Sequence, residues 1–253
     1  MSRLIIFAGP NGSGKSTITR KIQRDIDIGI YLNADDIEQH LHKNNVFDCE
    51  NYQVKVQEKD LRNFVRNNTI LQTICQYYNC FEEEFISTIV VKNNIVRFGS
   101  QYKISSYLSM IIVDYLRHYY LKNETSFCFE TVMSHSSKLE IMQNAKNQGF
   151  EVILYFVTTE SPLINVNRVK NRYAQGGHFV EEEKIVSRYN RSSDLLYDAL
   201  KLVDLAYLFD NSSDGQNEEL PCFATVFHGK EIELTSDLVP RWFNKFVIQK
   251  MNV

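Results

Sequence analysis

The sequence predicts a three-layer α/β fold with a mainly parallel central sheet. Five short apolar segments occur along the chain, and each is apolar on both faces, which is typical of buried parallel strands. Segments with helical periodicity separate most of them. The first apolar segment leads directly into a glycine-rich loop. Ligands of such folds bind beyond the carboxyl ends of the strands, so functional residues are expected directly after each strand.

The predicted strands follow one another with recognisable helices between them. The five strands are expected at 4–8, 31–33, 126–130, 152–157 and 205–209, with helices at 16–25, 161–173 and 181–200. Near the C-terminus, two further apolar runs flank His228 and Gly229, which predicts a β-hairpin over 223–227 and 232–234. A last helix is expected at 242–249. The whole chain, 1–253, is expected to form one domain.

The strand–helix pattern is interrupted between about residues 44 and 123. Apolar and aromatic residues recur there at helical spacing, namely Ile104, Leu108, Ile111, Tyr115 and Tyr119. Residues 53–78 can also be read as helix. We therefore expect an inserted helical region of about three helices, whose aromatic stripe forms a core rather than a ligand site.

Composition narrows the class of protein. With 253 residues and 43% hydrophobic content, the chain can bury a substantial core. A formal charge of -3 gives no general attraction to nucleic acid or to an anionic membrane, and neither is expected as a partner. We expect a cytoplasmic protein without a signal peptide or membrane span. The five cysteines lack CxxC spacing and are expected to be free thiols.

Residues 9–17 read GPNGSGKST and match the pattern G-x-x-x-x-G-K-S. Glycines allow the backbone to form a concave loop whose N–H groups face an anion, at the start of a helix. Lys15 can reach the β- and γ-phosphates, and the Ser16 hydroxyl can bind Mg²⁺. The pattern predicts a kinase-like P-loop NTPase fold that binds ATP or GTP. The residues expected to bind the nucleotide are Gly9, Pro10, Asn11, Gly12, Ser13, Gly14, Lys15, Ser16 and Thr17.

Two carboxylates follow the second predicted strand. Asp35 and Asp36 are placed to hold Mg²⁺ through water or to accept a proton from an attacking hydroxyl. The alternative is that one of them caps the helix that starts near Ile37, because aspartate is a favoured N-cap residue. Both interpretations can hold together, with one carboxylate for each role.

The third and fifth strands also end in polar residues. Glu130 and Thr131 end the third strand, and Glu130 is expected to bind metal or to accept a hydrogen bond from a substrate hydroxyl. A surface acid without function is the alternative. Asn211 follows the fifth strand, where its position favours contact with the nucleotide base.

Two arginine-bearing helices are predicted to form a mobile lid. Arg168 and Arg172 share a face of the helix at 161–173, and Gly176 and Gly177 join it to the helix at 181–200. A closing lid would bring cations to the transferring phosphoryl group and exclude water. The alternative is a solvated helix with Arg–Glu pairs. The second helix carries Arg188 and Arg191, and His178 in the connection is expected to be structural.

The chain resembles the zeta-toxin-like P-loop kinases in five segments, which are FAGPNGSGKST, YLNADDIE, FCFETVMSH, NRVKNRYAQGGHFVEEEKIVSRYNRS and YLFDNSS. They cover residues 1–42 and about 125–215 in the family's order. The resemblance implies an ATP-type phosphate donor and transfer of its γ-phosphoryl group to a hydroxyl of a small molecule. The best-studied toxins of this family phosphorylate UDP-N-acetylglucosamine on the sugar. The resemblance also implies an antitoxin as a protein partner.

The resemblance also implies roles for individual residues. By position, Asp35 matches the general base, Lys15 and Ser16 the phosphate and Mg²⁺ groups, Glu130 a substrate-binding acid, and Arg168 and Arg172 the lid cations. Asp36 and Thr131 are the further residues expected to contact the acceptor. The family's Glu-Gly-Thr is replaced here by Glu130-Thr131-Val132, and a long insertion follows Asp36. Both departures leave the kinase interpretation intact and the identity of the acceptor open.

Two other classes of P-loop protein are alternatives to a small-molecule kinase. The first is a P-loop ATPase that acts as a partner-regulated switch, although the chain has no LSGGQ-like segment and no NKxD or DxxG pair in register. The second is a nucleic-acid 5′-kinase, which the acidic balance and the absence of a basic stripe with aromatic residues disfavour.

Overall fold

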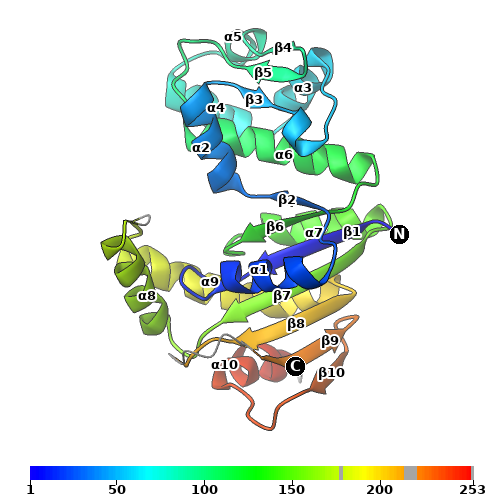
Figure 1. Ribbon diagram of the computed structural model, residues 1–253, viewed down its shortest axis with the longest axis vertical. Coiled ribbons are helices and arrows are strands. Elements are labelled where there is room, and N and C mark those ends of the chain that lie inside the picture. Colours follow the sequence, from blue (N-terminus) through cyan, green and yellow to red (C-terminus); the bar gives the residue numbers. More distant parts are fainter. Residues whose placement is uncertain (177–178, 214–220, 252–253) are drawn as a thin grey trace. The chain divides into compact units, whose positions relative to one another are not determined.

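The computed structural model describes residues 1–176, 179–213 and 221–251, and Gly177 and His178 of the predicted lid connection lie outside these ranges. The chain divides into two compact units (Figure 1). Unit 1 comprises Met1–Tyr31 and Glu124–Val253, and unit 2 comprises Leu32–Asn123. The predicted insertion at 44–123 falls within unit 2.

Unit 1 is built on a seven-stranded sheet with the order β10-β9-β8-β7-β1-β6-β2. Strands β6, β1, β7 and β8 are parallel to one another, whereas β9 runs antiparallel to β8 and forms a hairpin with β10. The predicted mainly parallel sheet and C-terminal hairpin are therefore confirmed. The strands are β1 (Arg3–Ala8), β2 (Ile30–Leu32), β6 (Phe127–Thr131), β7 (Glu151–Thr158), β8 (Leu205–Asp210), β9 (Cys222–Phe227) and β10 (Glu231–Leu234).

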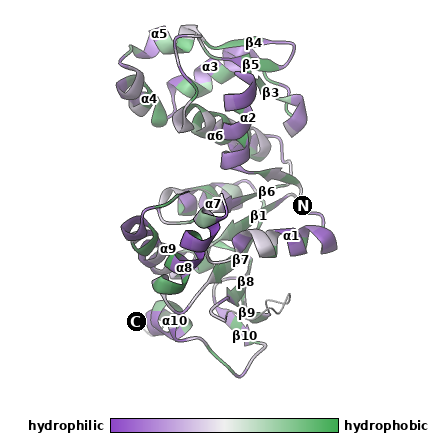
Figure 2. Ribbon diagram, turned by 60° about the vertical axis from the view of Figure 1, so that its left-hand side comes forward, coloured by the Kyte–Doolittle hydropathy of each residue, from purple (hydrophilic) through white to green (hydrophobic). Residues whose placement is uncertain are grey.

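Helices cover both faces of this sheet, which completes the predicted three layers. Figures 1 and 2 show α1 on one face and α7 and α9 on the other. The C-terminal segment starts as α10, continues through a π-helical turn at Asn244–Ile248 and ends as α11. The helices are α1 (Lys15–Asp25), α7 (Ser137–Asn147), α8 (Pro162–Ala174), α9 (Glu182–Leu202), α10 (Arg241–Phe243) and α11 (Gln249–Met251).

The core explains why these apolar runs become strands. Ile5 and Phe7 of β1 pack with Ile18 of α1 on one face of the sheet, and all three are essentially inaccessible to solvent. On the other face, Phe156 of β7 contacts the Trp242 ring at 6.1 Å between centroids. Burying such side chains stabilises the fold by about 1.5–3 kcal/mol each. A strand with large apolar side chains on both faces is stable only between two helical layers.

Unit 2 combines five α-helices with a small antiparallel sheet of order β3-β5-β4. The long predicted helix forms as α6, and its aromatic stripe is core: Tyr120 is fully buried and its hydroxyl donates to the Tyr52 carbonyl at 2.6 Å. The elements are α2 (Ala34–Asn44), β3 (Phe47–Asp48), a 3₁₀ turn (Glu50–Tyr52), α3 (Glu58–Arg66), α4 (Ile70–Tyr78), α5 (Glu82–Ser87), β4 (Val90–Lys92), β5 (Ile95–Arg97) and α6 (Ser106–Lys122).

Two features of unit 2 differ from the sequence expectation. The small sheet was not predicted, and the helix expected over 53–78 is two helices, α3 and α4. The break has a local cause, because the Asn68 side chain accepts the N–H of Ile70 at 2.9 Å and so competes with the helical hydrogen bond.

The five cysteines are free, as expected from their spacing, and Cys49 and Cys128 are buried. Burial and the nearby Asp48 charge raise the pKa of Cys49 to about 12, so its thiol stays protonated and behaves as a small apolar group. Within the described ranges, none of the helices has the length and apolar character required to cross a bilayer.

Candidate active site

The loop between β1 and α1 can be built only from glycine at its tightest points. Gly12 has φ +76°, and a Cβ there would lie 2.7 Å from the Asn165 carbonyl oxygen. Gly14 has φ +100°, and a Cβ there would lie 2.4 Å from the Asn211 amide nitrogen. Gly14 is also the N-cap residue of α1, where no side chain caps the helix. The first N–H groups of α1 therefore keep the partial positive charge that favours an anion.

Three predicted polar residues gather around this loop. The Lys15 ammonium donates to the Pro10 carbonyl at 3.0 Å, so it folds back over the loop. The Ser16 hydroxyl donates to a carboxylate oxygen of Glu130 at 3.1 Å. Glu130 reaches it from β6, whose residues pair with those of β1. A hydroxyl beside a carboxylate is a suitable oxygen pair for a Mg²⁺ ion that is also held by phosphates.

Thr131 has a structural use at the end of β6. Its carbonyl accepts the N–H of Gly9 at 3.2 Å, and its hydroxyl accepts the N–H of Met133 at 3.0 Å. The residue therefore fixes the start of the loop and the turn that follows β6. Thr17 is exposed in the first turn of α1.

Asn211 contacts the loop itself. Its side-chain amide donates to the Ser13 carbonyl at 2.8 Å, and its backbone N–H donates to Thr158 at 2.8 Å. The Arg168 guanidinium donates to the carbonyl oxygens of Asn211 at 2.7 Å and Ser213 at 3.1 Å. Arg168 thus holds the segment after β8 in place, and that segment holds the loop.

The lid arginines have different surroundings. The Arg172 side chain is exposed and makes no hydrogen bond or ion pair with a described residue. Arg188 of α9 donates to the side-chain oxygen of Asn11 in the loop at 3.2 Å. The sequence predicted a lid helix with Arg188 on it but did not select this residue. Lys170 of α8 forms an ion pair with Glu182 of α9 at 2.7 Å, which links the two predicted lid helices.

Asn165 is a residue that sequence reasoning missed. It is fully buried on α8, its amide donates to the Asn11 carbonyl at 2.6 Å, and its oxygen accepts from the Thr159 hydroxyl. The only signal in the sequence is a polar residue on the apolar face of α8, beside Val166 and Val169. Buried amides persist only when they are hydrogen-bonded, so Asn165 ties the loop to α8.

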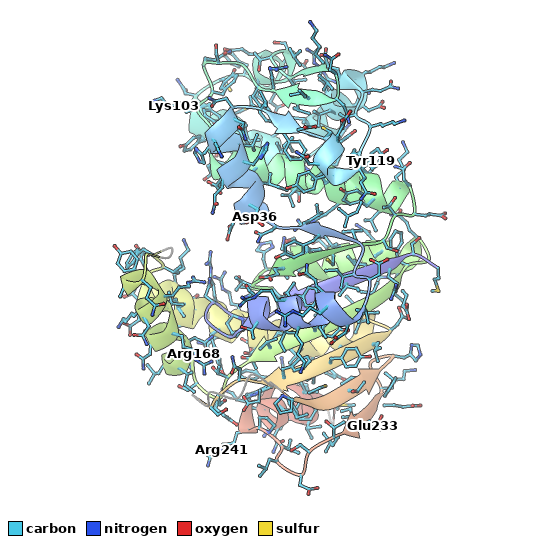
Figure 3. The ribbon with its side chains drawn as sticks, in the orientation of Figure 1. Asp36, Lys103, Tyr119, Arg168, Glu233 and Arg241 are labelled. Atoms are coloured by element: carbon cyan, nitrogen blue, oxygen red, sulfur yellow. The ribbon has the colours of Figure 1, made fainter. Side chains whose placement is uncertain are left out.

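Asp35 and Asp36 lie in the first turn of α2, in unit 2, and both are exposed. Figure 3 labels Asp36 at the start of this helix. The N-cap residue is Asn33, whose side-chain oxygen accepts the N–H of Asp35 at 2.9 Å. The alternative that an aspartate caps this helix is therefore wrong. Burial, and then the Asp36 charge, raise the pKa of Tyr52. Carboxylates in the first turn are stabilised by the helix dipole.

Comparisons of the sequence relate only part of the chain to a known protein. No family model matches the chain. A Haemophilus influenzae protein described as uncharacterized is 35% identical over 74 residues, which span 29% of this chain and 53% of that protein. The match therefore spans only about half of the relative's length.

Two solved structures are similar over almost the whole chain. The PezAT chromosomal toxin–antitoxin system of Streptococcus pneumoniae matches with a TM-score of 0.53 at 13% identity, covering 98% of this chain and 79% of that one. An AvrRxo1-ORF1:AvrRxo1-ORF2 complex with sulphate ions matches with a TM-score of 0.52 at 15% identity, covering 97% and 63%. The predicted α/β P-loop fold, and the resemblance at the level of fold, are confirmed.

Proposed function

We propose that the chain is an ATP-dependent kinase that transfers the γ-phosphoryl group to a hydroxyl of a small molecule. One observation carries the proposal, namely the glycine loop that opens α1 with Ser16 3.1 Å from the Glu130 carboxylate. Backbone N–H groups, a lysine and an oxygen pair for Mg²⁺ are the parts that grip a triphosphate. The fold shared with the PezAT toxin–antitoxin system and with the AvrRxo1-ORF1:AvrRxo1-ORF2 complex is compatible with it.

The proposed phosphate site uses cations from several elements. Lys15 would bind the β- and γ-phosphates, while Ser16 and Glu130 would hold Mg²⁺, which when bound neutralises phosphate charge. Arg168 and Arg172 are proposed as lid cations. The bonds of Arg168 to two backbone carbonyls support a positioning role in addition, and the contact of Arg188 with Asn11 makes it a further cation to test.

The proposed transfer step needs a base for the acceptor. The acceptor oxygen would attack the γ-phosphorus and give its proton to Asp35, while the bond from the γ-phosphorus to the bridging oxygen breaks and ADP leaves. Asp36 and Thr131 are proposed to bind the acceptor, together with the Glu130 carboxylate oxygen that does not accept the Ser16 hydroxyl. Because of the family resemblance, a UDP-sugar such as UDP-N-acetylglucosamine is the first acceptor to test.

The experiment incubates the protein with γ-labelled ATP, Mg²⁺ and a panel of UDP-sugars, nucleosides and nucleotides, and products are identified by mass spectrometry. Asp35→Asn is expected to retain ATP affinity and to lose transfer by about 10²–10³-fold, because it cannot accept the proton. The matched control is Glu38→Gln, which makes the same chemical change one turn later on α2 and should leave transfer unchanged.

Three outcomes would contradict the proposal. Unchanged transfer by the Asp35→Asn variant would remove the assigned base. ATP hydrolysis that needs a protein partner and yields no phosphorylated acceptor would favour a switch ATPase. Labelling of nucleic-acid 5′ ends would favour a polynucleotide kinase.

We also propose a protein partner that inhibits transfer. The fold's likeness to a toxin–antitoxin system and to a two-protein ORF1:ORF2 complex supports this idea. Co-expression with the product of an adjacent reading frame should give a complex that has lost transfer activity. A complex with unchanged activity would argue against inhibition.

A further inference from the structure

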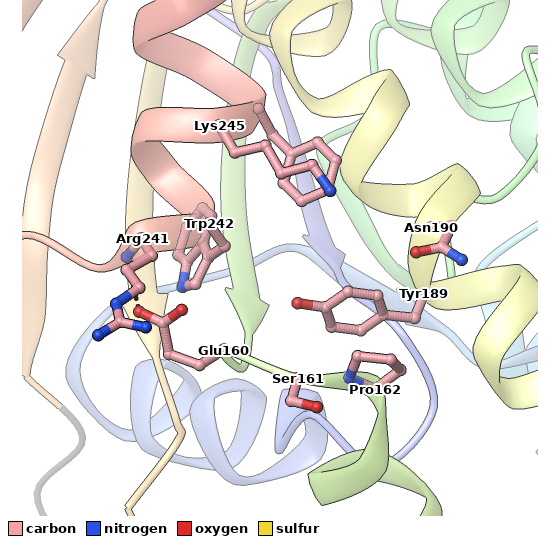
Figure 4. Close-up of a pocket in the computed structure, with 9 residues that line it drawn as sticks. Glu160, Ser161, Pro162, Tyr189, Asn190, Arg241, Trp242 and Lys245 are labelled. Carbon is pink, nitrogen blue, oxygen red and sulfur yellow. Dashed lines mark hydrogen bonds between the residues drawn. The ribbon is translucent and has the colours of Figure 1, made fainter.

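A cavity of about 740 Å³ lies in unit 1 at the carboxyl end of β7 (Figure 4). Its walls come from the segment between β7 and α8, from α9, and from the C-terminal helical segment. None of its lining residues belongs to the glycine loop or to the other residues of the proposed kinase site. Its volume lies within the range of about 300–1,000 Å³ that is usual for small-molecule sites.

Three buried aromatic side chains give the cavity a rigid apolar wall, and they are Tyr189, Trp242 and Phe246. The Tyr189 hydroxyl donates to the Thr159 carbonyl at 2.5 Å, and the Trp242 indole N–H donates to Asp210 at 3.1 Å. These bonds fix the orientation of both rings and use their polar atoms. Both residues are nearly buried, and the small ring area that each still exposes to the cavity is apolar.

Two cations of the C-terminal segment line the same cavity. Figure 4 shows the Lys245 side chain reaching across the cavity toward Asn190. The Lys245 ammonium lies 4.7 Å from the centre of the Phe246 ring, a contact that restrains its position. Neither Lys245 nor the Arg241 guanidinium forms an ion pair with a described residue. Both charges are thus available to an anion.

The Glu160 carboxylate, which also lines the cavity, already accepts a hydrogen bond. A Glu160 oxygen accepts the N–H of Arg241 at 2.6 Å, at the first residue of α10. This bond is charge-assisted and stabilises the negative charge at the start of a helical segment. Glu160 therefore holds the C-terminal segment to the end of β7, and the nearby Asp210 carboxylate accepts from Trp242 behind the wall, so the two side-chain cations are the charged lining groups left for an occupant.

We propose that this cavity is a second binding site, for a small ligand that carries a carboxylate or phosphate group on a flat apolar body. The anionic group pairs with Lys245 and Arg241, and the flat body lies against the aromatic wall. The site is separate from the kinase reaction and does not depend on it.

The chain contains a single tryptophan, Trp242, which lines the cavity and reports its occupancy directly. The experiment titrates the full chain with benzoate and with phenyl phosphate, with neutral benzamide as the matched probe, and follows tryptophan fluorescence. We expect a saturable change with at least one of the two anions and at least tenfold weaker binding of benzamide, because the neutral amide cannot pair with the cations. The titration is repeated with a saturating non-hydrolysable ATP analogue to separate this site from the glycine loop.

The same titration is carried out with the variant Lys245→Gln, which removes a charge from the cavity. The control is Lys230→Gln, which removes the same charge from the turn between β9 and β10, outside the cavity. Lys245→Gln should weaken anion binding at least about tenfold, the effect of losing one charge-assisted contact, and Lys230→Gln should leave it unchanged. Any of four results overturns the proposal: no saturable binding of either anion, equal binding of benzamide, equal binding by Lys245→Gln, or displacement of the probe by the ATP analogue.

Discussion

Unit 1 and unit 2 both bury large aromatic side chains, yet they use their polar side chains differently. In unit 2, polar side chains satisfy the backbone of long connections: the Asn94 amide donates to Val54 at 2.7 Å and accepts from Val56 at 2.9 Å. In unit 1, Asn165 and Asn211 bind carbonyl oxygens of the glycine loop. Two carbonyls of the loop, those of Asn11 and Ser13, are therefore held from outside, and the first N–H groups of α1, which no side chain caps, are placed to face an anion.

Because of this difference, the role of the polar residues can be recognised from the sequence in unit 1 but not in unit 2. A loop that binds phosphate needs specific residues at fixed spacing, so its function can be recognised from the sequence. A connection that only has to be hydrogen-bonded can be satisfied in many ways, so unit 2 carries no comparable motif. The comparison predicts that damage to the core of unit 2 and damage around the loop have separable effects.

The largest expected effect is a loss of stability caused by a substitution in the core of unit 2. Phe85 is fully buried and contacts the rings of Phe98 and Tyr102 at 6.0 and 5.1 Å. Phe85→Ala should lower the free energy of unfolding by about 3–5 kcal/mol, because the cavity adds to the lost burial. Urea denaturation measures it, and Phe81→Ala, at a side chain that is 84% exposed, is the control.

The same variant tests whether the stability of unit 2 and the ATP affinity of unit 1 are independent. ATP affinity of Phe85→Ala, measured below its unfolding midpoint, should equal that of the original protein, because the proposed nucleotide site lies in unit 1. A parallel loss of ATP affinity would contradict the separation of roles.

A smaller effect is expected at Asp204, at the amino end of β8. Burial raises the pKa of this carboxyl, but bonds from Lys146 and from the N–H of Val152 at 2.9 Å lower it more, so the pKa lies below its ordinary value of 3.8. The folded-state pKa is therefore depressed. The stabilisation is fully present above about pH 4 and is lost as pH falls through the folded-state pKa.

Asp204→Asn should therefore lower the free energy of unfolding of unit 1 by about 2 kcal/mol at pH 7, the contribution of charged hydrogen bonds. The difference from the original protein should shrink below pH 4. Denaturation at a series of pH values checks this, with Asp198→Asn as the control, since its pair with Lys201 is exposed. A difference that grows on acidification would refute the assigned direction of the pKa shift.

The smallest effect concerns Asn211. Removing its amide in Asn211→Ala deletes the bond to the Ser13 carbonyl and should loosen the loop by about 1 kcal/mol, or roughly fivefold in ATP affinity. Isothermal titration calorimetry measures the change. Asn171→Ala, at an exposed position on α8, should have no effect. Equal affinities of Asn211→Ala and the original protein would show that this bond does not support the site.

Much of unit 1 could be predicted because its signals are local. Each of the five strands predicted first is a short apolar run, and the observed bounds lie within one residue of those expected. The contacts of Asn165 and Arg188 with Asn11 could not be predicted, because they join segments more than 150 positions apart. In unit 2, strands of two or three residues are too short to give a periodic pattern.

The proposed function depends most directly on the binding of a triphosphate by residues 9–17. Calorimetric titration with ATP and Mg²⁺ tests it, comparing the original protein with Lys15→Ala and with the exposed α1 control Lys21→Ala. We expect saturable binding that Lys15→Ala weakens by about 10²-fold, because a charge-assisted contact to phosphate is lost. Lys21→Ala should leave the affinity unchanged. Absence of ATP binding by the original protein, or equal affinity of Lys15→Ala, would contradict it.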